Sequence, residues 1–268
     1  MSFTFSDPIF LTILATLFTW FMTSAGASLV FFVDAYNQKT MDFLLGFAAG
    51  IMIAASFFSL LLPSIHLSES MGNMKWMPAT LGFVGGGMTL FVIDKLLPHL
   101  HMYLPSSQPE GIRTKWNKNI LLVLAITIHN IPEGLAVGVA FGAAVTGQAT
   151  ASIAGAIALA VGIGIQDFPE GTAVSMPLRR NGLSKLKSFW YGQMSGLVEA
   201  VSAVIGVFAV VYVQQMLPYA LAFAAGAMIF VVVEELIPES QNGNHNDIAT
   251  LGTLSGFVVM MVLDVAFS

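Results

Sequence analysis

Two short motifs place carboxylate, amide and imidazole side chains, together with a proline, inside apolar stretches of the chain. The first motif reads Ile128-His-Asn-Ile-Pro-Glu-Gly134, and the second reads Ile165-Gln-Asp-Phe-Pro-Glu-Gly171. In the first motif His129 and Glu133 are four residues apart, so a helix presents both on one face, with Asn130 beside them. Imidazole, amide and carboxylate groups on one face form a binding group for a cation.

The proline of each motif is expected to free a backbone carbonyl oxygen, which could also bind a cation. Pro132 has no N–H and clashes with the preceding turn, so we expect it to break the helix and to free the carbonyl of Ile128. The second motif repeats this arrangement, and a third apolar stretch, Gly196–Ala200, contributes one more acid. The residues that these two stretches add are Gln166, Asp167, Pro169, Glu170 and Glu199.

The carboxylates among these residues carry charge that nothing in the same stretches balances. An ionised acid at the centre of a bilayer costs about 2.5–3.5 kcal/mol. The apolar stretches that hold Glu133, Asp167, Glu170 and Glu199 contain no Lys or Arg, so protons or a bound cation must balance them. Four protonated acids that only stabilise the fold are an alternative, which the duplication of the motif disfavours.

The donor atoms indicate which cation fits. The chain has no cysteine, which excludes disulfides and thiolate metal sites. Imidazole with carboxylate suits Zn²⁺, Fe²⁺, Mn²⁺ or Co²⁺, whereas sites made only of oxygen favour Ca²⁺ or Mg²⁺. The duplicated motif is compatible with one ion and with two ions bridged by Glu133 and Glu170.

The composition predicts that these motifs lie in a membrane. Of the 268 residues, 56% are hydrophobic and 9% are charged, against about 25% charged residues in an ordinary soluble domain. A chain with so few charges has to be coated by lipid, so we expect an all-α membrane protein. Its first apolar run, residues 8–33, is too long for the core of a cleaved signal peptide, and we expect a span there.

The length of the apolar stretches predicts the number of spans. A helix needs about 20 apolar residues to cross the hydrocarbon core. By this measure the chain is a single transmembrane domain, 1–268, whose longest polar connection is 98–118. The predicted spans are 8–33, 41–63, 77–97, 119–144, 149–176, 189–213, 217–237 and 248–267.

The distribution of basic residues predicts the orientation. An even number of spans places both termini on one side of the membrane. If that side is outside, the cytoplasmic segments include Lys39, Lys95, Arg113, Lys115, Lys118, Arg179, Arg180, Lys185 and Lys187, and the outer side keeps only Lys75. Because cytoplasmic loops carry the excess of Lys and Arg, both termini should be outside and the 98–118 loop cytoplasmic.

The chain also repeats itself. Leu45-Gly-Phe-Ala-Ala-Gly-Ile-Met-Ile53 in the second span resembles Leu221-Ala-Phe-Ala-Ala-Gly-Ala-Met-Ile229 in the seventh. The third and eighth spans share residues in register, namely Gly82, Gly86, Val92 and Asp94 with Gly252, Gly256, Val262 and Asp264. The second and seventh spans run in opposite directions, as do the fourth and fifth. An inverted repeat of this kind is typical of secondary transporters.

The two motifs, the eight spans and the stretch Val233-Glu-Glu-Leu-Ile-Pro-Glu-Ser240 resemble the ZIP (Zrt-/Irt-like) metal-ion transporters, in particular their bacterial GufA-like branch. The resemblance covers nearly the whole chain. It implies a 3+2+3 arrangement of the spans and a metal site between spans four and five. It further implies that His129, Glu133, Gln166 and Glu170 are ligands of one ion, and that Asn130, Asp167 and Glu199 join the bridging glutamates around a second.

The same resemblance adds a methionine and marks one departure. Met52 resembles the residue of the second span that contributes to the first ion site. Family members commonly carry a histidine where this chain has Gln166, which leaves the relative metal preference open.

Secondary candidates line the expected route of the ion. His99 and His101, on the cytoplasmic loop, resemble family histidines that receive metal after exit. Glu234 and Glu235 would line the exit, and His66 the outer mouth. Each of these residues is also readily explained as an ordinary loop or helix-end residue.

Together these observations predict a transporter, not an enzyme, with divalent metal ions and the lipid bilayer as its partners. Zinc is the first choice of ion, followed by Fe²⁺, Mn²⁺, Cd²⁺ or Co²⁺, and uptake into the cytoplasm rests on the resemblance alone. No prosthetic group and no nucleic acid is expected. The resemblance also suggests a bacterial inner (cell) membrane, and a homodimer remains open.

Two other functions stay open as alternatives. A calcium/cation exchanger also uses inverted repeats, but His129 argues against it because Ca²⁺ takes oxygen ligands. An intramembrane metallohydrolase would need a water-activating metal with an open coordination position, and neither HExxH nor its reverse occurs in the chain. No Walker motif occurs either, so ATP is not the expected driver.

Overall fold

The computed structural model of the chain describes residues 7–33, 37–100, 111–112, 114, 116–145, 152–243 and 245–267. Within these residues, eight helical segments are long and apolar enough to cross a membrane. They are Pro8–Phe31, Gln38–Leu67, Trp76–Leu96, Lys118–Val145, Ile153–Arg180, Lys185–Tyr212, Gln214–Ser240 and Asn246–Phe267. The prediction of an all-α membrane protein with eight spans is confirmed.

Several spans are built from more than one helical element. The first five spans contain α1 (Pro8–Ser28) with the 3₁₀ turn η1 (Leu29–Phe31), α2 (Gln38–Ala55) with the π-helical η2 (Ser56–Leu61) and α3 (Leu62–Leu67), α4 (Trp76–Leu96), α5 (Lys118–Val145) and α6 (Ile153–Arg180). A 3₁₀ segment, η3 (Glu69–Met74), precedes α4. The last three spans contain α7 (Lys185–Ser195) with α8 (Leu197–Tyr212), then η4 (Gln214–Met216), α9 (Leu217–Val231), the π-helical η5 (Val232–Leu236) and α10 (Ile237–Ser240), and finally α11 (Asn246–Phe267).

Polar side chains fix where several helices begin. Asp7, Asn37, Ser152 and Ser184 each accept a hydrogen bond from a backbone N–H in the first turn of the helix that follows. Each cap satisfies a donor that has no partner within the helix. Ser184 caps α7, and α6 continues to Arg180. The connection between these helices is therefore shorter than residues 177–188, the segment left between the two predicted spans.

The surface of the bundle is apolar and its interior contains the polar groups, the reverse of a soluble protein. Large apolar side chains point outward along the spans, as Phe21, Leu81 and Leu254 do with about 60% of their surface exposed. The carboxylates of the two motifs are buried instead. This surface therefore suits contact with lipid. The buried ionisable groups indicate a functional site in the interior of the bundle.

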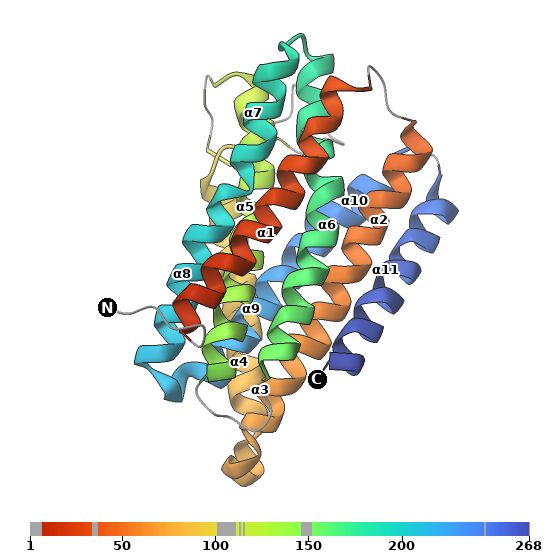
Figure 1. The fold of residues 1–268 in the computed structure, drawn as a ribbon. Helices are drawn as coiled ribbons and strands as arrows, with labels where there is room; N and C mark the ends of the chain where they lie inside the picture. Colours follow the sequence, from red (N-terminus) through yellow and green to blue (C-terminus); the bar gives the residue numbers. More distant parts are fainter. Residues whose placement is uncertain are drawn as a thin grey trace.

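The two ends of the bundle differ in charge. In Figure 1 the start of α1 and the end of α11 lie toward the lower end, whereas the α6–α7 connection and the start of α5 lie at the upper end. At the upper end Lys118 donates a hydrogen bond to Asn181 (2.9 Å). Arg179 and Arg180 lie in the last turn of α6 at that end. The start of α1 and the end of α11 thus lie opposite this basic end.

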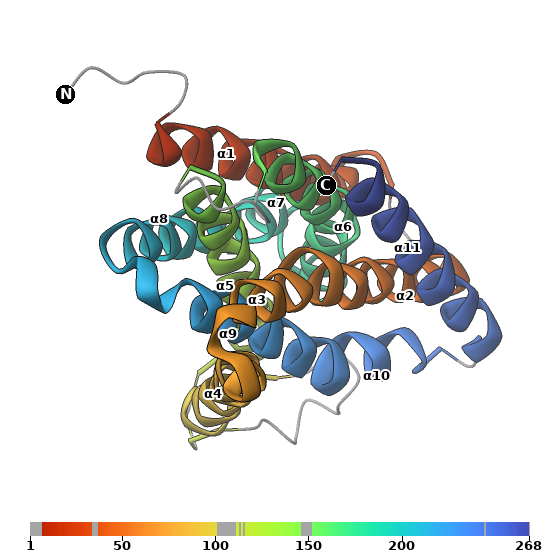
Figure 2. The ribbon, with the colours of Figure 1, turned by 90° about the horizontal axis from the view of Figure 1, so that it is seen from below.

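The helix packing follows the repeat that the sequence contains. The most extensive pairs are α1 with α6, α5 with α8, α2 with α11, and α4 with α9. Exchanging the first three spans with the last three, and the fourth with the fifth, turns the α1–α6 pair into the α8–α5 pair. The same exchange turns the α4–α9 pair into the α11–α2 pair. Figure 2 shows α1, α5, α6, α7 and α8 on one side of the bundle and α2, α4, α9 and α11 on the other.

Glycines allow close backbone contact within these pairs. A Cβ added at Gly26 would overlap the carbonyl of Phe168, joining α1 to α6, and one at Gly138 would overlap the carbonyl of Ala203, joining α5 to α8. On the other side of the bundle, a Cβ at Gly86 would overlap the carbonyl of Phe223 on α9. Each pair is therefore held by a tight backbone seam that a larger residue would open.

The motif prolines do not break their helices, contrary to the sequence expectation. Both α5 and α6 continue through Pro132 and Pro169, because packed neighbours tolerate proline in a membrane helix. Irregular turns occur instead before Pro63 and Pro238. There the N–H of Leu62 bonds to the carbonyl of Phe57, and the N–H of Ile237 to that of Val232, five residues back.

Candidate metal site

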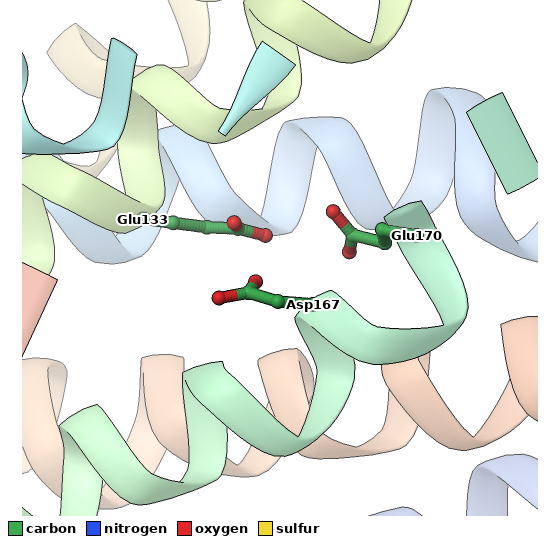
Figure 3. A group of neighbouring side chains, drawn as sticks. All are labelled: Glu133, Asp167 and Glu170. Carbon is green, nitrogen blue, oxygen red and sulfur yellow. The ribbon is translucent and has the colours of Figure 1, made fainter. Parts of the chain in front are cut away.

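Three carboxylates from the two motifs converge between α5 and α6. Glu133 comes from α5, and Asp167 and Glu170 come from α6. One oxygen of each lies within 4.8 Å of one oxygen of both others, and all three side chains are buried. Figure 3 shows the three carboxyl groups pointing toward a common space.

An amide side chain is paired with a carboxylate at each edge of this cluster. Gln166 donates from Nε2 to Oε1 of Glu133 (2.5 Å). Asn130 donates from Nδ2 to Oε1 of Glu199 (3.0 Å). Because a carboxylate can only accept, both amides must turn their oxygens the other way.

These pairings leave a set of buried oxygens without partners. Seven oxygen atoms of the site are inaccessible and have no hydrogen-bond partner among the described residues. They are Asn130 Oδ1, Glu133 Oε2, Gln166 Oε1, Asp167 Oδ1 and Oδ2, and Glu170 Oε1 and Oε2. Buried polar atoms are normally satisfied, so such a concentration requires a cation or protons at this place.

The histidine of the first motif lies toward a different helix from the three acids. His129 Nε2 contacts the carboxylate of Glu235 in η5, so this contact joins α5 to the seventh span. Glu235 thus contacts the histidine of the first motif, whereas the sequence analysis placed it only among the candidates for the exit. Its neighbour Glu234 is half-buried.

Two residues near the site were missed by the sequence analysis. Glu239 in α10 is half-buried and close enough to interact electrostatically with Glu235 and Glu170. Its spacing of four residues from Glu235 could have suggested it. Thr19 in α1 donates a hydrogen bond to Glu199 (2.5 Å).

The other residues singled out from the sequence lie apart or inside the core. Met52 is fully buried on α2, in the hydrophobic core that also contains Ile128. His99 is buried beyond the end of α4, where its Nε2 lies 3.0 Å from Asp94. His66 is exposed in the last turn of α3, and His101 lies outside the described residues.

Oxygen donors dominate the site, with one imidazole at its edge. Carboxylates, amide oxygens and imidazole together suit a divalent metal ion of the zinc, iron or manganese type. The three acids come from spans that contain no Lys or Arg at this depth. Fold and site define the class: a multi-pass α-helical membrane protein with a buried cluster of carboxylates that could hold a metal ion.

Comparisons with known proteins identify the family within that class. Residues 106–264 match the family described as ZIP zinc transporters. The chain is 40% identical to the zinc transporter ZIP11 of Homo sapiens, over 97% of this chain and 98% of that protein. It is 36% identical to the zinc transporter GufA of Myxococcus xanthus (95% and 98%) and 38% identical to the zinc transporter ZIPB of Bordetella bronchiseptica (91% and 77%). The chain therefore belongs to the ZIP family of transporters, which confirms the resemblance.

Proposed function

We propose that this protein carries zinc ions across the membrane into the cytoplasm through the buried site between α5 and α6. The seven unpaired oxygens support this most directly, because they form a ready coordination shell for a cation. The names of the related proteins support zinc as the ion. Fe²⁺, Mn²⁺, Cd²⁺ and Co²⁺ are further substrates that the same donors accept.

The site holds two ions in this proposal. His129, Glu133, Gln166 and Glu170 surround the first, with Met52 near it, and Glu133 and Glu170 bridge to the second. Asn130 and Asp167 complete the second site, together with Glu199. The support is that Asp167 lies within 4.8 Å of both bridging acids and has two unpaired oxygens. Two neighbouring divalent ions would also balance the negative charge of these carboxylates, for which the spans provide no Lys or Arg at this depth.

Movement of the ion follows from two groups of helices that shift past each other. Spans one, four, five and six form one group, and spans two, three, seven and eight form the other. The proposed 3+2+3 arrangement is the inverted repeat behind them, in which the first three spans correspond to the last three and the fourth span to the fifth. The extensive pairs and their glycine seams lie within these groups. Across the boundary, Gly162 of α6 faces the side chains of Met260 and Ile51 instead of backbone, a contact that can slide.

The charge distribution supports an orientation in which both termini of this multi-pass protein lie outside, whereas inward transport rests on the resemblance to the ZIP family. The basic end of the bundle is cytoplasmic in this orientation, and the cell membrane of a bacterium is the proposed location. His99 and the neighbouring Asp94 lie at that end, on the release side. His66 lies at the opposite end, on the entrance side.

The alternatives explain less of the site. A calcium/cation exchanger leaves the imidazole of His129 without a role, since Ca²⁺ prefers oxygen. A metallohydrolase needs a substrate-sized space beside the metal, whereas Glu133, Asp167 and Gln166 are all fully buried. A metal-ion carrier that makes or breaks no covalent bond needs neither an all-oxygen site nor a substrate-sized space. We therefore propose that the protein is not an enzyme.

Zinc titration of the purified protein by calorimetry tests the two-ion site. We expect two Zn²⁺ per chain, and a heat that changes with the ionisation enthalpy of the buffer because ligands release protons when metal binds. Asp167→Asn should bind one Zn²⁺. Thr127→Ala should bind two, since within the described part of the chain the Thr127 hydroxyl bonds only to the carbonyl of Val123 in its own helix. One ion in the wild type would overturn the two-ion arrangement, and none would overturn the function.

A further inference from the structure

Glu199 differs from the other acids of the site in that both its oxygens are already occupied. Oε1 accepts a hydrogen bond from Asn130 Nδ2 (3.0 Å), and Oε2 accepts one from Thr19 Oγ1 (2.5 Å). Glu133, Asp167 and Glu170 instead each have at least one oxygen without a partner. In this structure Glu199 therefore holds the side chain of Asn130 by a hydrogen bond. A contact between Glu199 and an ion would come in addition to this bond.

The effect on Asn130 is to fix which end of its amide faces the site. An ionised Glu199 can only accept, so its Oε1 holds the Nδ2 group of Asn130. The amide oxygen, Asn130 Oδ1, is left buried and unpaired. Held in this way, Asn130 offers its oxygen to a cation, and it does not have to turn when the ion arrives.

Thr19 in turn fixes Glu199. Its side chain is fully buried on α1, and its hydroxyl has one proton to donate. The oxygen of Glu199 lies 2.5 Å away, whereas the alternative acceptor, the carbonyl of Thr16, lies at 3.2 Å. The shorter contact is to a carboxylate, the stronger kind of acceptor.

Three other buried threonines share this face of α1, and they behave differently. Thr12, Thr16 and Thr23 donate to carbonyls of α1 itself, which is the usual local bond of threonine in a helix. Thr19 reaches across to α8, 180 residues away in the sequence. Of these four threonines, Thr19 is the one whose hydrogen bonds, within the described residues, reach a residue of the site.

We propose that Thr19 is a positioning residue of the metal site, which acts through Glu199 to present the amide oxygen of Asn130 to the second ion. This inference rests on the proposed function, since it assumes the two-ion site. The hydrogen-bonded chain Thr19–Glu199–Asn130 links α1, α8 and α5. Outer groups of this kind change metal affinity by about 10–100-fold when they are removed.

Zinc titration of Thr19→Val tests the proposal, because valine keeps the shape and removes the hydroxyl. We expect one of the two zinc affinities, that of the second ion, to fall by about 10-fold or more, while the other changes much less. Thr19→Ser, which keeps the hydroxyl, should restore wild-type binding. Thr16→Val is the matched control, since the Thr16 hydroxyl bonds only within α1 among the residues that the structure describes, and it should bind like the wild type.

The outcomes separate this inference from the proposed function. Wild-type protein that binds two zinc ions, together with Thr19→Val that binds them with unchanged affinities, would overturn the role of Thr19 alone. Absence of zinc binding by the wild type would overturn the function itself. If Thr19→Val does not fold, Thr19→Ala takes its place, and equal affinities for Thr19→Ala and Thr19→Ser would also overturn the inference.

Discussion

Glu133→Ala and Glu170→Ala should each abolish zinc transport and leave a folded protein. In the proposed two-ion site each residue bridges both ions, and both side chains are buried with unpaired oxygens. Loss of an outer partner of a metal site costs about 10–100-fold in affinity, so loss of a bridging ligand should cost at least about 100-fold. Zinc titration and uptake into proteoliposomes measure the two effects on the same preparation.

These variants should fold because they remove uncompensated charge from the interior. An acid in the bilayer costs free energy, so a thermal melt of the metal-free Glu133→Ala protein should be no lower than that of the wild type. Thr127→Ala, on the same helix, is the control that should keep full transport. Zinc uptake near the wild-type rate by well-folded Glu133→Ala would show that the ion travels elsewhere.

His129→Gln should change which metal the site prefers. Glutamine replaces an imidazole nitrogen by an amide oxygen, and imidazole favours zinc whereas oxygen donors favour manganese. We expect the ratio of zinc to manganese affinity to fall at least about tenfold, which corresponds to about 1.4 kcal/mol. Competition titrations with both metals give this ratio directly.

A second histidine provides the control for this experiment. His245 contacts Asp42 (3.0 Å) near the start of α11, away from the site. His245→Asn keeps a donor for that carboxylate, and the ratio of affinities should stay at the wild-type value. An unchanged ratio in His129→Gln would mean that His129 serves only to contact Glu235 and is not a ligand.

The part of the site that is local in sequence could be predicted without a structure. His129, Asn130 and Glu133 follow the spacing of one helical face, and the second motif repeats that spacing around Asp167. The length of the apolar stretches predicted the spans, because the thickness of a bilayer sets the length of a helix. The first argument needs only the period of a helix and the chemistry of the side chains. The second needs only the rise of a helix per residue and the thickness of the bilayer.

Features that depend on contacts between spans could not be predicted in this way. Glu235 in η5 reaches His129 only because the seventh span, through α9, packs against α5. Thr19 reaches Glu199 only because α1 packs against α8. The continuity of α5 through Pro132 was also missed. A proline rule that holds for an isolated helix fails where neighbouring helices support the turn.

Uptake of metal ions into proteoliposomes is the most direct test of the claim that this chain carries zinc. With purified wild-type protein, the account predicts that Zn²⁺ accumulates faster than in protein-free vesicles, and that excess Cd²⁺ or Co²⁺ slows it while Ca²⁺ does not. Folded wild-type protein that moves Zn²⁺ no faster than protein-free vesicles would contradict it. Rapid uptake of Ca²⁺ in place of Zn²⁺ would contradict it as well, and would favour the exchanger.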